Sequence, residues 1–322
     1  ARYTDANLDF NGCSGDSGDG TMAAAWNRVF GTAVQPGGCV TLSPTFTTGL
    51  VGKTLDETNT SWRSGVDWKP MKDALLYLNV SKGYKSGSFP ILSASTSTQL
   101  NPVTQESVLA YEAGFKLKTL AQTLQLNGAV FYYDYKDKQI RGRVVVPVFG
   151  PLEGLVNVPK SEVRGAELQL NWVAFQGFTA NLGLTYIDSR VKNFANYDPY
   201  GVPRTFDDEA FPLTPKWQGT ADLQYEWPVS EALNGFVGGN VNYQSSTYGS
   251  FGEIPLLKID AYTLLDLRAG VRTNDGRWSL SAWGRNVTDK YYWTFADHFS
   301  DTTVRFAGMP RTYGIGVTYR YE

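Results

Sequence analysis

Apolar and polar residues alternate along many short stretches of this chain. In residues 217–227 the odd positions are Trp, Gly, Ala, Leu, Tyr and Trp, whereas every even position is polar. The same period of two recurs in residues 111–118, 166–172, 180–186 and 312–321. Because successive side chains of a β-strand point to opposite faces, each stretch is predicted to be a strand with one apolar and one polar face.

The alternation predicts an all-β chain of about twelve antiparallel strands, each on the order of ten residues long, as a tilted membrane-spanning strand requires. Hydrophobic residues make up 42% of the chain, yet they do not gather into a long apolar run. A membrane-spanning helix needs about 18 such residues, so a helical membrane protein is not expected. The expected strands lie at residues 1–9, 59–68, 74–85, 106–118, 122–135, 159–174, 178–190, 215–227, 235–247, 259–273, 277–289 and 310–321.

The connections between these strands are alternately short and long. Short ones follow the even strands, at 69–73, 119–121, 175–177 and 274–276, and the last contains an Asp-Gly hairpin signal. This asymmetry is typical of a transmembrane antiparallel up-and-down β-barrel, with long loops outside the cell and short turns in the periplasm. The long connections are rich in Gly, Ser, Thr, Asn and Pro and lie at 10–58, 86–105, 136–158, 191–214, 248–258 and 290–309.

Aromatic residues are sorted by strand end. Tyr and Trp prefer the headgroup level of a bilayer, where the ring lies in hydrocarbon and the polar tip reaches water. A soluble β-sandwich also alternates, but it gives no reason for such sorting. We therefore expect a barrel in the bacterial outer membrane, in contact with lipid. The turn-side aromatics are Trp68, Trp172, Trp227 and Tyr321, and the loop-side ones include Tyr84, Tyr132, Tyr135, Tyr186 and Tyr243.

Charge and cysteine content refine this picture. The net charge of −2 and the lack of a basic run make nucleic acid an unexpected partner. Cys13 and Cys39 both lie in the first long connection. A disulfide between them suits an oxidising compartment, and two free thiols are the alternative. Neither belongs to a C-x-x-C pair, so we expect no metal or redox motif there.

Five segments of the chain resemble the barrel of one transporter family. They read Val-Ser-Lys-Gly-Tyr-Lys-Ser-Gly-Ser-Phe at 80–89, Tyr-Glu-Ala-Gly-Phe-Lys at 111–116, Arg-Gly-Ala-Glu at 164–167, Asn-Val-Thr-Asp-Lys-Tyr-Tyr at 286–292, and Pro-Arg-Thr-Tyr-Gly at 310–314. In this order they are similar to motifs in the C-terminal barrel of TonB-dependent outer-membrane transporters. Each motif is weak alone, and the shared order gives the resemblance its weight.

The resemblance implies more than the strands show. Family barrels have about 22 strands around a plug, so residues 1–322 resemble one domain, the C-terminal part of the barrel, without the N-terminal plug. Such a protein imports a scarce ligand, most often a ferric siderophore, using energy from TonB, ExbB and ExbD. It does no chemistry on its substrate and needs no cofactor. The alternatives are a passive porin, a structural barrel, and a membrane phospholipase acting through His298 with a serine such as Ser300.

Two sets of residues are candidates for the functional site, and none is assigned to catalysis or to a metal. Polar residues on the strands are expected to line the lumen, where they contact a ligand or, alternatively, only one another and water: Glu112, Glu167, Asp222, Arg268, Arg285 and Arg320. Loop residues, mostly aromatic, offer large contact area at small entropic cost and are the ligand-binding candidates: Phe89, Tyr197, Tyr200, Phe206, Tyr248, Phe251, Trp293, Phe295 and His298.

Overall fold

A computed structural model describes residues 1–119, 121–299 and 301–321. Its main feature is a 12-stranded antiparallel sheet, which we call the wall. Neighbouring strands of the wall follow one another in chain order. The all-β, up-and-down barrel architecture is therefore confirmed, as a partial barrel wall. The strands are β1 Arg2–Gly12, β2 Val51–Met71, β3 Ala74–Lys85, β4 Glu106–Thr119, β5 Leu124–Val146, β6 Gly150–Phe175, β7 Phe178–Lys192, β10 Trp217–Pro228, β11 Leu233–Gln244, β14 Tyr262–Thr273, β15 Trp278–Arg285 and β18 Thr312–Tyr319.

All of these strands were expected, but several extend beyond the predicted bounds. The β5–β6 hairpin continues through residues 136–158, which were predicted to be a loop. β2 begins at Val51, eight residues before the prediction. Alternation is enforced where one face meets lipid, and it fades where a strand continues into water, so the sequence pattern ends before the strand does. Leu120, in the predicted turn 119–121, lies outside the described residues.

Smaller elements occupy the connections that were expected to be long loops. Helix α1 lies in the first, the short helix η1 lies in 86–105, and pairs of short strands lie in or beside 191–214, 248–258 and 290–309. Within the described residues, neither α1 nor any other helix is long and apolar enough to span a bilayer. These elements are α1 Thr21–Phe30, η1 Ser97–Leu100, β8 Ala195–Tyr197, β9 Pro203–Thr205, β12 Thr247–Tyr248, η2 Pro255–Leu257, β13 Lys258–Ile259, β16 Trp293–Phe299 and β17 Thr302–Ala307.

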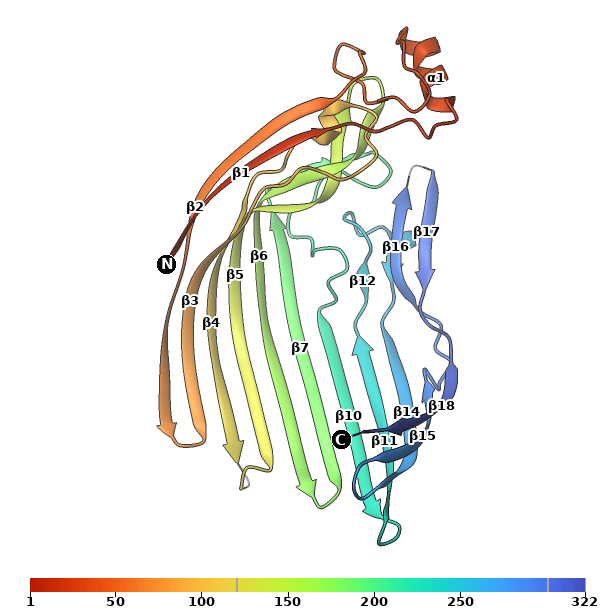
Figure 1. The fold of residues 1–322 in the computed structure, drawn as a ribbon. Helices are drawn as coiled ribbons and strands as arrows, with labels where there is room; N and C mark the ends of the chain where they lie inside the picture. The colour runs from red at the N-terminus through yellow and green to blue at the C-terminus, as the bar shows by residue number, and fades with distance from the viewer. Residues whose placement is uncertain (120, 300, 322) are drawn as a thin grey trace.

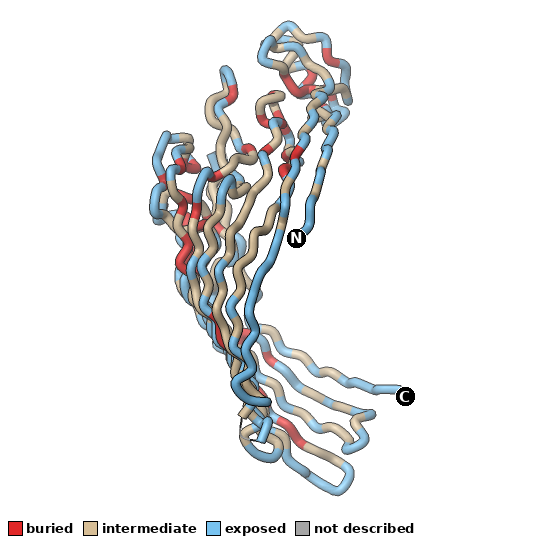
Figure 2. Tube along the Cα trace, turned by 90° about the vertical axis from the view of Figure 1, so that its left-hand side faces the viewer, coloured by how far each residue is buried: buried red, intermediate tan, exposed pale blue. Residues whose placement is uncertain are grey.

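The strands form one curved wall, with the tight turns at one end and α1, the loops and the β16–β17 hairpin at the other (Figure 1). Among the described strands, β1 and β18 lie at the two edges and do not pair with each other. The chain therefore does not by itself close the pore that the porin alternative requires. Buried residues gather at the loop end (Figure 2). The described strands form a single layer with nothing packed on either face, so few of their side chains are buried.

The strand register divides the wall into an apolar and a polar face. Leu168 and Leu184 lie directly opposite each other and are both exposed, on the face that would meet lipid. The register from β3 to β18 places the residues predicted to line the lumen together on the opposite face. Whether that face lines the lumen stays a prediction. These residues are Glu112, Glu167, Asp222, Arg268 and Arg285, with Arg320 continuing the same alternation after β18.

An ion pair on the polar face spans three strands. The Arg268 guanidinium on β14 donates to both carboxylate oxygens of Asp222 on β10, at 2.7 and 2.8 Å. To do so it lies over Gly238 on the intervening β11, where an added Cβ would be 2.9 Å from the guanidinium carbon. A glycine at this position therefore makes room for a bidentate pair that ties β10 to β14.

Glycines of the wall recur directly opposite aromatic side chains. Phe131 is opposite Gly165, and its ring covers the place where a Cβ would be. Such aromatic–glycine pairs shield the backbone of the glycine and fix strand register. They occur on both faces of the wall, at Tyr77–Gly114, Phe115–Gly128, Phe236–Gly270, Trp227–Gly235 and Trp283–Gly314.

The first loop is held as a compact cap. Cys13 and Cys39, the pair for which a bridge was expected, are joined by a disulfide with a Cα–Cα distance of 5.7 Å. The Asp16 carboxylate accepts backbone N–H groups at both ends of the α1 region, from Gly20 at 2.9 Å and Gly37 at 3.2 Å. Burial would raise the pKa of Asp16, but its backbone N–H donors together lower that pKa.

Replacing Gly165 by alanine is expected to destabilise the wall by about 1–3 kcal/mol, because the new methyl group clashes with the Tyr186 carbonyl and the Phe131 ring. Gly219→Ala is the matched control, since its Cβ would meet Leu184 at an ordinary 3.7 Å. The thermal unfolding midpoint of protein purified from outer membranes measures both. Equal midpoints for the two variants would contradict the aromatic–glycine account.

Candidate functional site

The loop end of the wall contains its own hydrophobic core. Phe206 is only 1% exposed and packs with Phe194 and Phe251, with ring centroids 5.4–5.7 Å apart. Val158 on β6, Val191 on β7 and Phe211 complete this cluster. The long loops are therefore packed onto the strand ends, and they form a fixed surface above the wall.

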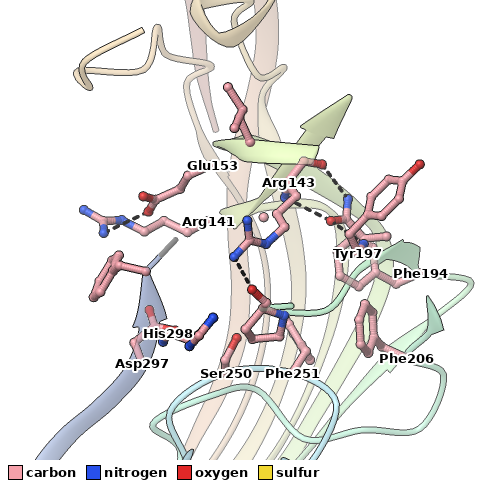
Figure 3. A pocket seen from close by; sticks show the side chains of 15 residues that line it. Arg141, Arg143, Glu153, Phe194, Tyr197, Phe206, Ser250, Phe251, Asp297 and His298 are labelled. Atoms are coloured by element: carbon pink, nitrogen blue, oxygen red, sulfur yellow. Dashed lines mark hydrogen bonds and ion pairs between the residues drawn. The ribbon is translucent and has the colours of Figure 1, made fainter. Parts of the chain in front are cut away.

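A cavity of about 290 Å³ opens beside this core, and we call it the loop pocket. Its walls come from four parts of the chain: the β5–β6 hairpin, the segment after β7, the loop between β12 and β13, and β16 (Figure 3). The lining residues are Arg141, Gly142, Arg143, Leu152, Glu153, Phe194, Asn196, Tyr197, Pro199, Phe206, Ser250, Phe251, Asp297, His298 and Phe299.

Arg143 is the best-oriented charge in the loop pocket. Its guanidinium donates to the carbonyl of Pro199 at 2.6 Å and to that of Pro151 at 3.3 Å. Asn196 holds its backbone, accepting from the N–H at 2.9 Å and donating to the carbonyl at 3.1 Å. Because neutral carbonyls orient the guanidinium without cancelling its charge, Arg143 can still attract an anion.

Arg141 and Glu153 form a second, more exposed feature of the loop pocket. They lie across the β5–β6 hairpin with a nitrogen–oxygen distance of 3.2 Å (Figure 3). Exposed pairs of this kind contribute little to stability and exchange partners readily. Arg141 is therefore available to turn toward an anionic ligand.

Asp297 and His298 enter the loop pocket from β16. Burial raises the pKa of Asp297, Glu153 raises it further, and Arg143 and Arg141 oppose the shift. The Asp297 carboxylate accepts the backbone N–H of His298 at 2.8 Å. The His298 ring lies 4.5 Å from the Tyr200 ring, between centroids, and its Nδ1 is 3.2 Å from the Thr303 hydroxyl.

Comparison with known proteins identifies the wall. The family model described as TonB dependent receptor-like, beta-barrel, matches residues 3–287. The chain belongs to this family. The resemblance read from the motifs is therefore confirmed, and the outer-membrane location follows from the family.

Solved structures of several uptake and siderophore receptors share the fold. The ferric yersiniabactin uptake receptor of Yersinia pestis is 19% identical over 85% of this chain and 39% of its own, with a TM-score of 0.68. The ferric-catecholate import receptor of E. coli K12 is 16% identical over 99% and 41%, with a TM-score of 0.69. A siderophore receptor of Acinetobacter baumannii is 20% identical over 85% and 37%, with a TM-score of 0.65. The chain spans about two fifths of the length of these proteins.

This receptor barrel brings together some of the predicted ligand-binding residues. Tyr197, Phe206, Phe251 and His298 line the loop pocket, and the tilted Tyr200 ring contacts His298. Phe206 is almost fully buried, so its role in the structure is in the core beneath the pocket.

The other predicted loop residues lie elsewhere. Phe89 stacks on Phe10, with ring centroids 5.0 Å apart, near the start of the wall. Trp293 and Phe295 pack within the β16–β17 region, the latter against Phe306 at 5.3 Å. Tyr248 belongs to the small β12–β13 pair. These residues do not line the loop pocket.

Sequence reasoning missed the charged members of the loop pocket. Arg141, Arg143 and Glu153 were overlooked because residues 136–158 were expected to be an irregular loop. The Arg-Gly-Arg run at 141–143 was the available signal. Among the described residues, no group of three or more His, Cys, Asp or Glu side chains could hold a metal ion.

The phospholipase alternative placed His298 beside a serine. In the structure the contacts of the His298 ring are with Thr303 and Tyr200, and Ser300 lies outside the described residues. The family of this barrel is one of receptors and transporters rather than enzymes.

Asp297→Asn is expected to stabilise the β16–β17 hairpin at neutral pH and to have little effect at acid pH. A carboxyl whose pKa is raised by burial favours folding below its unfolded pKa, and that contribution is lost as pH rises through the folded pKa. Asparagine keeps the acceptor for His298 without the charge. Hydrogen–deuterium exchange of residues 293–299 at two pH values measures this, and equal protection of both proteins at neutral pH would contradict it.

Proposed function

We propose that this chain is part of an active transporter that imports a ferric siderophore across the outer membrane. Its loops face the exterior and its turns face the periplasm, and TonB with ExbB and ExbD supplies the energy. The observation that carries the proposal is a charged and aromatic loop pocket at the open end of a TonB-dependent receptor barrel wall. Three proteins with this fold are named as receptors for siderophores or iron chelates.

The loop pocket suits an anionic, partly aromatic ligand. Ferric chelates present deprotonated oxygen donors, and many carry negative charge. Arg143 offers an oriented positive charge, and Tyr197 and Phe251 offer ring faces. Among the described lining residues, His298 is the one imidazole, so a ligand that brings its own chelating atoms fits better than bare iron bound by side chains.

The proposed orientation is supported by the distribution of loops and aromatic residues. The disulfide-bonded cap and the hydrophobic loop core both lie at the loop end of the wall. In outer-membrane barrels the longer and more structured connections face the exterior, and the turns face the periplasm. The loop pocket would then be open to ligands outside the cell.

Uptake of radioactive iron tests the proposal directly. Cells that lack the endogenous receptors and express the intact protein are offered iron bound to catecholate, hydroxamate or carboxylate siderophores. We expect uptake of at least one class, and we expect its loss when TonB is deleted. Uptake that persists without TonB would support passive diffusion and contradict active transport.

Arg143→Ala is expected to weaken siderophore binding by about tenfold or more, the usual effect of removing a charge-assisted contact. Arg28→Ala is the matched control, because Arg28 is an exposed arginine of the α1 cap that does not line the loop pocket. Quenching of tryptophan fluorescence by the ferric siderophore measures binding to protein purified from outer membranes. Equal affinities for both variants would rule out the loop pocket as the binding site.

A further inference from the structure

Three lysines lie side by side on the apolar face of the wall. Lys136 on β5 is directly opposite Lys160 on β6, which is directly opposite Lys192 on β7. They share this face with Leu168 and Leu184, and we call them the lysine row. Like charges directly opposite each other destabilise a sheet. Negatively charged groups close to the three lysines would therefore stabilise this part of the sheet.

The chain supplies only part of that charge. Lys160 is 3.5 Å from Glu162 and Lys192 pairs with Asp208, but Lys136 has no ion pair within the described part of the chain. We count the charged residues at outward positions near the row, together with their ion-pair partners. Seven are cationic and four are anionic, an excess of three positive charges in a chain whose net charge is −2. The cations are Lys82, Lys136, Lys160, Arg164, Arg190, Lys192 and Lys216, and the anions are Asp134, Glu162, Asp188 and Asp208.

The lysine row lies just beyond an aromatic belt. Tyr132, four residues before Lys136 on the same face, lies 6.4 Å from the Tyr111 ring, between centroids. Tyr186 and Trp217 continue the belt at 4.7 Å. Four residues of a strand cover about 13 Å, less after tilt, so the lysines lie in the headgroup layer.

An apolar groove lies on the membrane side of the belt. Its outward lining includes the small residues Ala113, Gly128 and Ala166, and it reaches Tyr186 and Trp217 of the belt. The hollow has a volume of about 590 Å³. The hollow forms because the side chains of Ala113, Gly128 and Ala166, on three adjacent strands, are small. The Phe115 ring lies over Gly128 and forms part of the floor of the hollow. We call it the acyl groove.

We propose that the outer wall of β4–β7 binds a phosphorylated lipid of the outer leaflet, with its phosphates on the lysine row and an acyl chain in the acyl groove. The proposal rests on the loop orientation given above, but not on the imported ligand. A phosphate monoester carries about −1.5 to −2 at neutral pH, so two phosphates match the excess of three positive charges. A lipid with two phosphates is therefore the preferred occupant over a zwitterionic one.

Native mass spectrometry of the intact protein extracted from outer membranes tests this. Delipidated protein in detergent is mixed with diphosphoryl lipid A, monophosphoryl lipid A or phosphatidylethanolamine. We expect the wild type to retain the diphosphoryl lipid best, and the double variant Lys136→Gln with Lys160→Gln to bind it about 25-fold more weakly. The control, Lys69→Gln with Lys72→Gln, removes the same charge at the β2–β3 turn and should bind like the wild type.

Ala166→Leu tests the acyl groove without changing any charge. We expect it to weaken binding of the same lipid, whereas Ala221→Leu, on the same face but outside the groove, should not. Equal retention by the lysine variant and the wild type overturns the proposal, and so does equal loss in both lysine variants. Because lipid retention is measured without siderophore, a failure here leaves the uptake result to be judged separately.

Discussion

Backbone hydrogen bonding in hydrocarbon is the constraint on which this structure depends. Each unpaired N–H or carbonyl in lipid costs several kilocalories per mole, so a membrane wall must pair every strand on both sides. Strands β3 to β15 of the sheet have a neighbour on each side, whereas β2 pairs with β1 over residues 51–61 and with β3 from residue 62 onward. Among the described strands, β1 and β18 have one neighbour each. These two edges therefore carry backbone groups without a strand partner in the described sheet, and the solved structures that share the fold are longer chains, of which this one covers about two fifths.

A wall one layer thick cannot bury a core, so its side-chain contacts run sideways along the sheet. Rings cover the glycines opposite them, as Phe131 covers Gly165, and the Arg268–Asp222 pair crosses β11 over Gly238. These contacts fix register and leave both faces free for lipid and solvent. The hydrophobic core then forms only where the loops fold over the strand ends, and the loop pocket lies beside that core.

The predictable part of the structure is the part that lipid constrains. The twelve strands could be predicted from the alternation of apolar and polar residues. Their order in the sheet could be predicted from the alternation of short and long connections. Beyond the membrane that constraint ends, which is why the extension of β5 and β6 was missed. Helix α1 depends on contacts of Asp16 and a disulfide that alternation does not encode. Of the residues that line the loop pocket, Tyr197, Phe206, Phe251 and His298 were among the predicted ligand-binding residues, whereas Arg141 and Arg143 were not, because they lie on that unforeseen hairpin.

One interruption of the ladder explains how the same hairpin carries two kinds of surface. Just after Lys136, Asp137 has a φ of 54°, and Pro159, just before Lys160, has no N–H to donate. The side chain of Asn157 donates to the Asp137 carbonyl at 2.6 Å. This bond gives the carbonyl a partner in place of a backbone N–H from the neighbouring strand. Such irregular backbone is costly in lipid and harmless in water. We infer that β5 and β6 leave the membrane at this level, with the lysine row on its membrane side and Arg141 and Arg143 on the part of the hairpin beyond it, at the loop pocket.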